Sequence, residues 1–225
     1  MRKASVLIPV TMRETAAILV SRAHQPIVVN SFGRSGSTVL FDAVSSSAAR
    51  FGALSEEKVV RSSAWKLDSD RVRRGRVYKS HDYPMPSLPA DTRVLYVFGS
   101  PEDATLSLIE RARVSGQQWL DEHADHLRVP HFAPEDLLQS DVLRIADHLR
   151  AWLSQEIVAT GFVRYETMWD HQKEISDFVG FSVSLPKRRE RQTKEGGSAD
   201  DLRMVYADAI RLVDSLPDWS IRNPG

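Results

Sequence analysis

A run of glycine and hydroxyl residues near the start of the chain has the composition of an anion-binding loop. Residues 31–38 read SFGRSGST; they follow a β-branched run at 26–30 and precede residues 39–44, whose apolar spacing is helical. A loop between a strand and a helix N-terminus binds anions, because free backbone N–H groups and the helix dipole point at the ligand. Gly33 and Gly36 allow close backbone approach, and Arg34 adds a charge for phosphate or sulfate oxygens. The full strand–loop–helix context favours this interpretation over a simple connection.

The loop departs at two positions from the GxxxxGK[ST] pattern of nucleotide triphosphatases. Ser31 takes the place of the first glycine, and Ser37 takes the place of the lysine that cradles the β and γ phosphates. The missing lysine argues against ATP hydrolysis. A small-molecule kinase with a degenerate Walker loop stays open as an alternative, although no strand ends in an obvious aspartate for Mg²⁺.

A lysine and a histidine stand at the predicted end of another strand. Lys79 closes the short strand predicted at 76–79, and His81 follows two residues later. Active sites collect at the carboxyl ends of parallel strands, and an imidazole of near-neutral pKa suits general base catalysis. The alternative interpretations are a surface or helix-capping histidine and an ordinary strand-end lysine.

Four segments, in this order, resemble the sulfotransferases that use 3′-phosphoadenosine 5′-phosphosulfate (PAPS). Residues 31–40 are similar to the family's 5′-phosphosulfate-binding loop, 78–81 to its Lys-Thr-His strand end, 95–107 to its 3′-phosphate segment, and 163–181 to its Arg/Lys-Tyr-Glu strand and following Phe-Leu-Gly helix. The resemblance covers most of the chain. It implies a P-loop α/β sulfotransferase with PAPS as donor, adenosine 3′,5′-bisphosphate as product and no metal.

The resemblance also implies residue roles. His81 would be the general base, while Arg34 and Lys79 would neutralise charge on the bridging and leaving oxygens. Ser107 would bind the 3′-phosphate. Arg188 and Arg189, in the basic stretch before Gly196 and Gly197, would close over it; a solvated basic loop is the alternative for that stretch. The phosphosulfate would be held by Gly33, Arg34, Ser35, Gly36, Ser37 and Thr38.

Gly99 is the main departure from the family, which has an arginine there for the 3′-phosphate. Arg111, Arg113 or the basic stretch supplies the charge instead, or the donor differs, or it binds weakly. A backbone nest at Gly99 and Ser100 would also receive an anion. A catalytically idle nucleotide-binding protein that kept the fold therefore stays open as a second alternative.

The elements that must position these groups alternate between strand and helix. Strands are predicted at 26–30, 76–79, 93–98 and 162–165, and helices at 39–44, 101–114, 134–153, 168–179 and 202–212. Pro101, followed by Glu102 and Asp103, marks one helix start. This order predicts one three-layer α/β/α domain over residues 1–225, with a mostly parallel sheet.

Residues 116–133 are polar and rich in histidine, and they show no clean period. We interpret them as a lid or an acceptor-recognition segment, in which Trp119 offers a flat apolar surface to a sugar or an aromatic acceptor. The spacing of His123, His126 and His131 does not match HExxH, and no cysteine assists, so no metal site is predicted.

The overall composition excludes several classes of function. Thirty basic residues balance thirty acidic ones, so a general attraction to nucleic acid is not expected. The absence of cysteine excludes disulfides and thiolate chemistry. No apolar run approaches the roughly 20 residues that span a bilayer, and residues 6–10 are interpreted as a strand or packing arm. We expect a cytoplasmic enzyme acting on a hydroxyl or amine of a small-molecule or carbohydrate acceptor.

Overall fold

A five-stranded sheet in the order β2-β1-β3-β4-β5 forms the centre of the computed structural model, which describes residues 24–51, 72–188 and 199–225. The strands are β1 (Ile27–Asn30), β2 (Val77–Ser80), β3 (Arg93–Phe98), β4 (Ala159–Arg164) and β5 (Trp219–Arg222). The first four run parallel, and β5 runs antiparallel to β4. The arm predicted at residues 6–10 lies outside the described residues.

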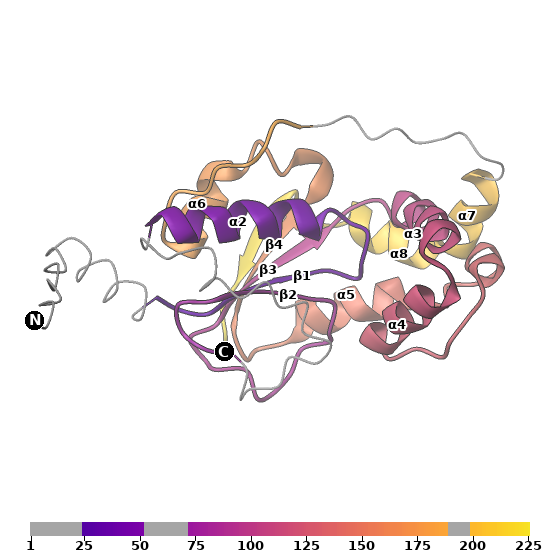
Figure 1. Cartoon of the computed structure of the whole chain (residues 1–225), viewed down its shortest axis with the longest axis horizontal. Coiled ribbons are helices and arrows are strands. Elements are labelled where there is room, and N and C mark those ends of the chain that lie inside the picture. Colours follow the sequence, from indigo (N-terminus) through magenta and orange to yellow (C-terminus); the bar gives the residue numbers. More distant parts are fainter. Residues whose placement is uncertain (1–23, 52–71, 189–198) are drawn as a thin grey trace, which may run out of the picture.

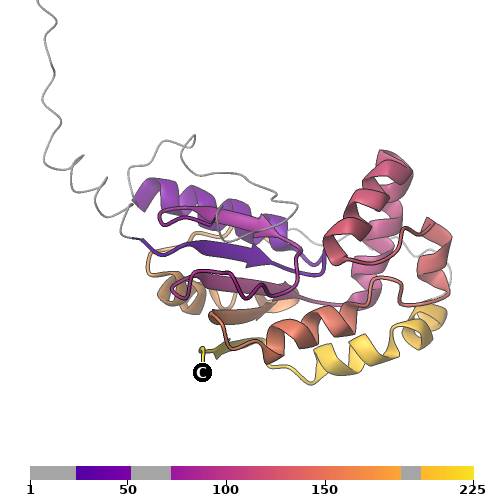
Figure 2. The same ribbon diagram turned by 90° about the horizontal axis from the view of Figure 1, so that it is seen from below.

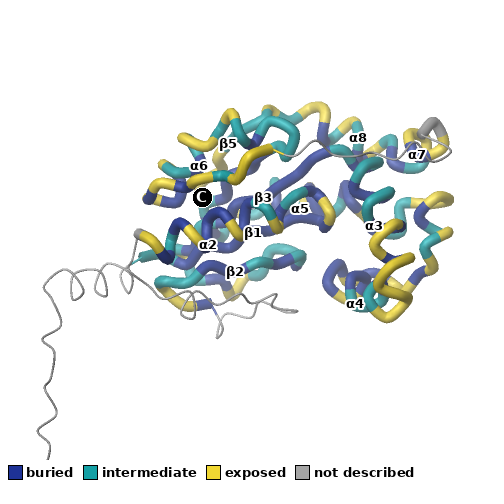
Figure 3. The backbone as a smooth tube through the Cα atoms, turned by 45° about the horizontal axis from the view of Figure 1, so that its top comes forward, coloured by how far each residue is buried: buried dark blue, intermediate teal, exposed yellow. Residues whose placement is uncertain are grey.

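Helices bury both faces of the sheet, because successive side chains of a strand point to opposite sides. Ile27 and Val29 belong to one core and Val28 to the other. The first core contains α2 (Ser37–Phe51) and α6 (Gln172–Val179); the second contains α3 (Pro101–Ser115), α4 (Gln117–Leu127), α5 (Ile145–Ser154), α7 (Ala199–Val205) and α8 (Ala207–Asp214). Figure 1 shows α2 and α6 on one side of the sheet and α5 on the other, and Figure 3 shows β1 and β3 as buried. The predicted three-layer fold is confirmed.

The register of the parallel strands brings three loops to one edge of the sheet. Asn30, the last residue of β1, pairs with Ser80 of β2 and with Tyr96 of β3. The segments that leave these strands therefore start side by side. Figures 1 and 2 show α3 and α4 beyond this edge, where they face the loop between β1 and α2.

Two predicted helices are each divided into two elements. The helix predicted from Pro134 to Leu153 is a 3₁₀ turn, η2 (Pro134–Leu138), followed by α5. α5 begins after Arg144, whose backbone is left-handed, and both carboxylate oxygens of Asp141 accept from the Ile145 N–H, at 3.2 and 3.3 Å. The Asp141 side chain thereby satisfies the first N–H of the new helix. The helix predicted at 202–212 is α7 and α8, separated at Tyr206, whose buried hydroxyl donates to the Leu137 carbonyl at 3.0 Å.

Other bounds also differ from the sequence-based expectation, and two elements were not predicted. α2 is longer than the predicted 39–44, and β4 begins at Ala159 instead of residue 162. The helix predicted from residue 168 begins at Gln172, after a 3₁₀ turn, η3 (Tyr165–Thr167). The segment without a clean period forms α4 over Gln117–Leu127, because His123 and His126 are buried and complete its inward face. β5 was not predicted, and it extends the sheet by pairing with β4. In the described part of the chain, no helix is long and apolar enough to cross a membrane.

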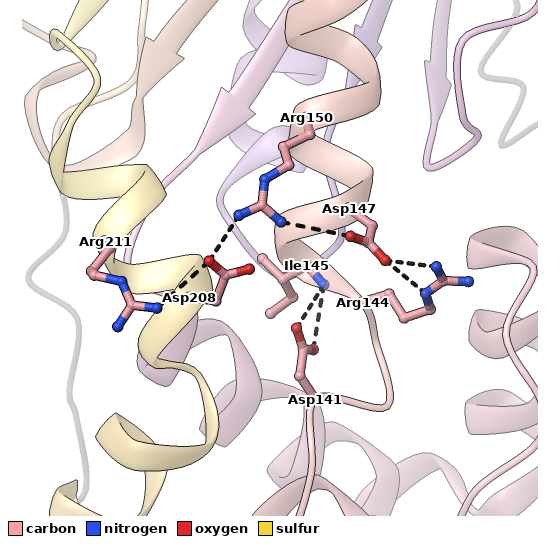
Figure 4. Close-up of polar contacts among 7 residues, drawn as sticks. All are labelled: Asp141, Arg144, Ile145, Asp147, Arg150, Asp208 and Arg211. Carbon is pink, nitrogen blue, oxygen red and sulfur yellow. Dashed lines mark hydrogen bonds and ion pairs between the residues drawn. The ribbon is translucent and has the colours of Figure 1, made fainter.

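Charged side chains connect α5 with α8 at the surface (Figure 4). Arg150 Nη2 lies 2.8 Å from Asp208 Oδ1, and Arg150 Nη1 lies 3.7 Å from Asp147 Oδ1. Such exposed ion pairs contribute little to stability because water screens them. Asp141, which caps α5, differs from them: withdrawal from water raises its pKa to about 6. Its ionised form therefore costs free energy in the folded state.

We predict that Asp141→Asn stabilises the fold at neutral pH, because an amide keeps the cap without a buried charge. The raised pKa of Asp141 means that the contribution of this group to wild-type stability falls as pH rises from about 4 to 6 and is level above that range. Urea unfolding should therefore show no advantage of the variant near pH 4 and an advantage of roughly 1–2 kcal/mol at pH 7.5.

Asp208→Asn is the matched control. Its hydrogen bond to Arg150 lowers the pKa of this exposed carboxyl, so the interaction is present at neutral pH and is lost on acidification. This variant should be no more stable than wild type at pH 7.5. An Asp141→Asn advantage that does not change between pH 4 and 7.5 would contradict the assignment.

Candidate active site

The loop at residues 31–38 makes a tight turn between β1 and α2. Gly33, Arg34 and Gly36 have positive φ angles of 101°, 52° and 92°. For Arg34 this conformation costs on the order of 1 kcal/mol, and such strain collects at functional sites. Ser31 Oγ stabilises the turn by accepting from the Gly33 N–H at 3.1 Å and donating to Ser37 Oγ at 2.9 Å. Because α2 begins at Ser37, the first N–H groups of the helix face the loop.

The two loop glycines are required by their neighbours as well as by their backbone angles. A Cβ on Gly33 would overlap the imidazole of His123, and a Cβ on Gly36 would overlap the ring of Tyr165. α4 and the turn after β4 therefore press directly on the loop backbone. The loop is held from two sides by aromatic rings.

Three side chains of the loop reach other elements. Arg34 Nε and Nη2 donate to Ser107 Oγ on α3 at 3.1 and 2.9 Å. Thr38 Oγ1 accepts from Lys79 Nζ on β2 at 2.9 Å. Ser35 instead points away from these groups, and its Oγ donates to the Val97 carbonyl at 3.0 Å. Lys79 thus brings an ammonium from the neighbouring strand to the loop, which carries serine where a Walker loop carries lysine.

His81 is oriented by the carbonyl of Ser31. Its Nδ1 lies 2.8 Å from that carbonyl oxygen and 3.2 Å from Ser31 Oγ. Because a carbonyl only accepts, Nδ1 carries the proton, and Nε2 is the unprotonated nitrogen of the neutral ring. This tautomer leaves Nε2 as the atom that can take a proton.

These groups line a single cavity of about 590 Å³, here called the strand-end cavity. It contains groups from the loop, β2, α3, α4 and the turn after β4. Its lining residues are Arg34, Gly36, Ser37, Thr38, Val39, Lys79, His81, Ser107, Arg111, Trp119, Glu122, His123, His126 and Tyr165.

The electrostatics of the cavity keep His81 and His123 neutral. Burial, followed by the neighbouring His123 and Lys79, lowers the pKa of His81 well below its ordinary value. Burial, His126 and Arg34 lower the pKa of His123 to about 3. The pKa of Lys79 is also lowered, first by burial and then by Arg34. At neutral pH the cavity therefore combines cationic side chains with uncharged imidazoles.

The space beside Gly99 is occupied by a carboxylate. Glu166 Oε1 accepts from the Ser100 N–H at 3.1 Å, and a Cβ on Gly99 would lie 2.8 Å from the same oxygen. A larger residue at position 99 would have to displace Glu166. Of the two arginines considered as substitutes, Arg111 lines the strand-end cavity; it lies over Trp119, 5.9 Å from the ring centroid.

Not all of the predicted ligand-binding residues line the cavity. The cavity is lined by Arg34, Gly36, Ser37, Thr38, Lys79, His81 and Ser107. Gly33 instead packs against His123, and Ser35 bonds the Val97 carbonyl. Arg188 lies elsewhere, over the ring of Trp169 at 5.7 Å, and Arg189 is outside the described residues.

One wall of the cavity comes from the segment interpreted as acceptor-recognising, of which the sequence analysis gave a role to Trp119 alone. Trp119, Glu122, His123 and His126 lie on one face of α4, at the spacing i, i+3, i+4 and i+7. Trp119 stacks on His123 with centroids 5.6 Å apart. The helical period becomes visible only when both histidines are counted as buried residues. In the described ranges, no group of three or more His, Asp or Glu side chains is arranged to hold a metal ion.

Comparisons with known proteins give similarity at the level of solved structures. No family model matches the chain, and no curated protein sequence matches it. Mouse sulfotransferase SULT7A1 complexed with PAP has 18% identity and a TM-score of 0.42, over 78% of this chain and 65% of that one. Retinol dehydratase in complex with androsterone and the inactive cofactor PAP has 15% identity and a TM-score of 0.43, over 76% and 65%. The chain thus aligns with slightly less than two thirds of either protein.

We predict that Gly36→Ala disrupts the loop more than the same change at Gly116, which also has a positive φ, of 83°, but has nothing within 4 Å of a new Cβ. Gly116→Ala should cost about 1 kcal/mol for the backbone angle alone. Gly36→Ala adds the overlap with Tyr165 and should cost roughly 2–4 kcal/mol. Urea unfolding measures the free energy of unfolding of both variants. Equal losses of stability would show that the Tyr165 ring moves aside without cost.

Proposed function

We propose that this protein is a sulfotransferase that takes PAPS as donor and transfers the sulfuryl group to a hydroxyl or amine of a small-molecule or carbohydrate acceptor. The observation that carries the proposal is the convergence of Arg34, Lys79, His81 and Ser107 on one cavity. These residues come from three separate segments of the chain, and the sequence resemblance gives each of them a role in the transfer. The cavity volume, about 590 Å³, is in the range of small-molecule sites.

The anion-binding elements suit a phosphosulfate. The loop backbone at Gly36 and the start of α2 supply N–H groups and a favourable helix dipole. The ammonium of Lys79 reaches the loop at Thr38, and the guanidinium of Arg34 extends from the loop to Ser107 on α3. Both would stabilise negative charge as it develops on the leaving phosphate. Ser107, which already accepts from Arg34, would meet the 3′-phosphate side of the donor.

His81 supplies the base that the transfer needs. In the net step, the sulfur–oxygen bond to the donor phosphate breaks as a bond from sulfur to the acceptor oxygen forms. The acceptor proton passes to His81 Nε2, and the electron pair remains on the phosphate of adenosine 3′,5′-bisphosphate. The Ser31 carbonyl, 2.8 Å from Nδ1, keeps Nε2 in its unprotonated form and would stabilise the imidazolium that follows.

A kinase is the rival with the same fold. At the position where a Walker loop has its lysine, this chain has Ser37, which is buried and bonded to Ser31. Adenosine 3′,5′-bisphosphate and Mg²⁺·ATP therefore discriminate between the two functions.

We predict that the protein binds adenosine 3′,5′-bisphosphate without magnesium, and more tightly than ATP with magnesium, in calorimetric titration. Arg34→Ala should lower the affinity for the bisphosphate by about 10-fold or more, because a charge-assisted contact is lost. Arg113→Ala is the matched control, since Arg113 is an exposed arginine of α3 that does not line the strand-end cavity. A preference for Mg²⁺·ATP would support the kinase, and absence of binding to either would refute both proposals.

We predict that His81→Asn reduces PAPS turnover by roughly 10²–10⁴-fold while leaving bisphosphate affinity nearly unchanged, because only proton transfer is lost. His131→Asn, at an exposed site beside Asp125, should have no effect. Since the pKa of His81 is lowered, the base form persists on acidification, so the acid limb of kcat/KM should lie well below pH 6.5. An unchanged rate in His81→Asn would exclude it as the base.

A further inference from the structure

The segment that carries His81 leaves an edge strand. Among the described residues, β2 is the first strand in the sheet order and pairs with β1 alone, so no described strand supports its outer side. His81 follows Ser80, the last residue of β2, directly. A catalytic base needs a position defined to a fraction of an ångström. Something other than the sheet must hold this backbone.

Side chains of β1 and α5 hold it by its carbonyl groups. The Asp82 carbonyl lies 3.1 Å from Asn30 Nδ2, 3.2 Å from His148 Nε2 and 3.0 Å from Trp152 Nε1, all of which are positioned to donate. The His81 carbonyl accepts from His148 Nε2 at 3.1 Å. One imidazole of α5 therefore bridges the carbonyl of His81 and that of the next residue.

The tautomer of His148 follows from its partners. Both carbonyls only accept, so Nε2 carries the proton, and Nδ1 accepts from the Tyr96 hydroxyl at 2.7 Å. His148 is completely buried, and burial lowers its pKa to about 4. The ring is therefore a neutral donor at physiological pH. Trp152, one turn further along α5, is 1% exposed and donates to the same loop.

From this arrangement we infer that His148 is a positioning residue for His81: its Nε2–H holds the His81 and Asp82 carbonyls and thereby fixes the backbone from which the base projects. This inference rests on the proposed function for its consequence in catalysis, but the positioning itself is a property of the fold. His148 is not among the residues that line the strand-end cavity, so we expect no direct role for it in binding the donor.

The substitutions that test this role distinguish loss of the His148 hydrogen-bond donor from a general loss of stability. His148→Phe keeps an aromatic ring and removes the donor, so the His81 carbonyl loses its partner. His148→Gln keeps an N–H donor. Tyr96→Phe is the matched control, because it removes a buried hydroxyl bonded to the same imidazole while leaving both Nε2–H bonds in place.

The primary measurement is ¹⁵N-histidine NMR of the full chain, in which His81 should appear as the Nδ1–H tautomer. We expect His148→Phe to shift His81 toward a tautomer mixture, and His148→Gln and Tyr96→Phe to keep the wild-type pattern. Urea unfolding of His148→Phe and of Tyr96→Phe should show comparable losses of stability. An unchanged His81 spectrum in His148→Phe, or an equal change in Tyr96→Phe, would overturn the inference.

Calorimetry and turnover separate this inference from the proposed function. Adenosine 3′,5′-bisphosphate should bind His148→Phe as tightly as wild type, while kcat with PAPS falls roughly 10- to 100-fold and recovers in His148→Gln. If wild type does not bind the bisphosphate, the proposed function fails, whereas the NMR result still decides whether His148 positions His81.

Discussion

Parallel pairing of β1 with its two neighbours is the constraint on which the candidate site depends. Asn30 lies level with Ser80 on one side and Tyr96 on the other, so β1 and β2 end level with each other and β3 ends two residues further on, at Phe98. A shift of register by one residue would turn every side chain of a strand to the opposite face. The hydrophobic layers on both faces prevent such a shift, and the polar groups at the strand ends are thereby brought together.

The site combines cationic and neutral groups in a way that its surroundings explain. Arg34 and Lys79 are held by hydroxyl groups, while His81 and His123 stay uncharged because they are withdrawn from water and lie near those cations. A neutral base beside positive charge suits a reaction in which the proton comes from a hydroxyl and the leaving group is an anion. The same environment would disfavour prolonged protonation of His81.

The sequence was informative where local chemistry decides the structure. The loop at 31–38, the bounds of β3 and the start of α3 at Pro101 follow from glycine spacing, β-branched runs and capping residues, and all were predicted closely. α4 and the division between α7 and α8 depend on tertiary contacts instead. His123 and His126 are polar in sequence but buried in the fold, and Tyr206 interrupts a helix to reach the Leu137 carbonyl. The role inferred for His148 likewise involves contacts across more than 60 positions, which no local pattern encodes.

The bond from Lys79 to Thr38 has a consequence for the cavity before any ligand arrives. A carboxylate partner would cancel the ammonium charge, and a ligand would then compete with an ion pair. A hydroxyl fixes the direction of the side chain at 2.9 Å and leaves its charge in place. An anionic ligand at this point would therefore exchange a weak acceptor for a strong one, on a side chain that has already lost much of its rotational freedom.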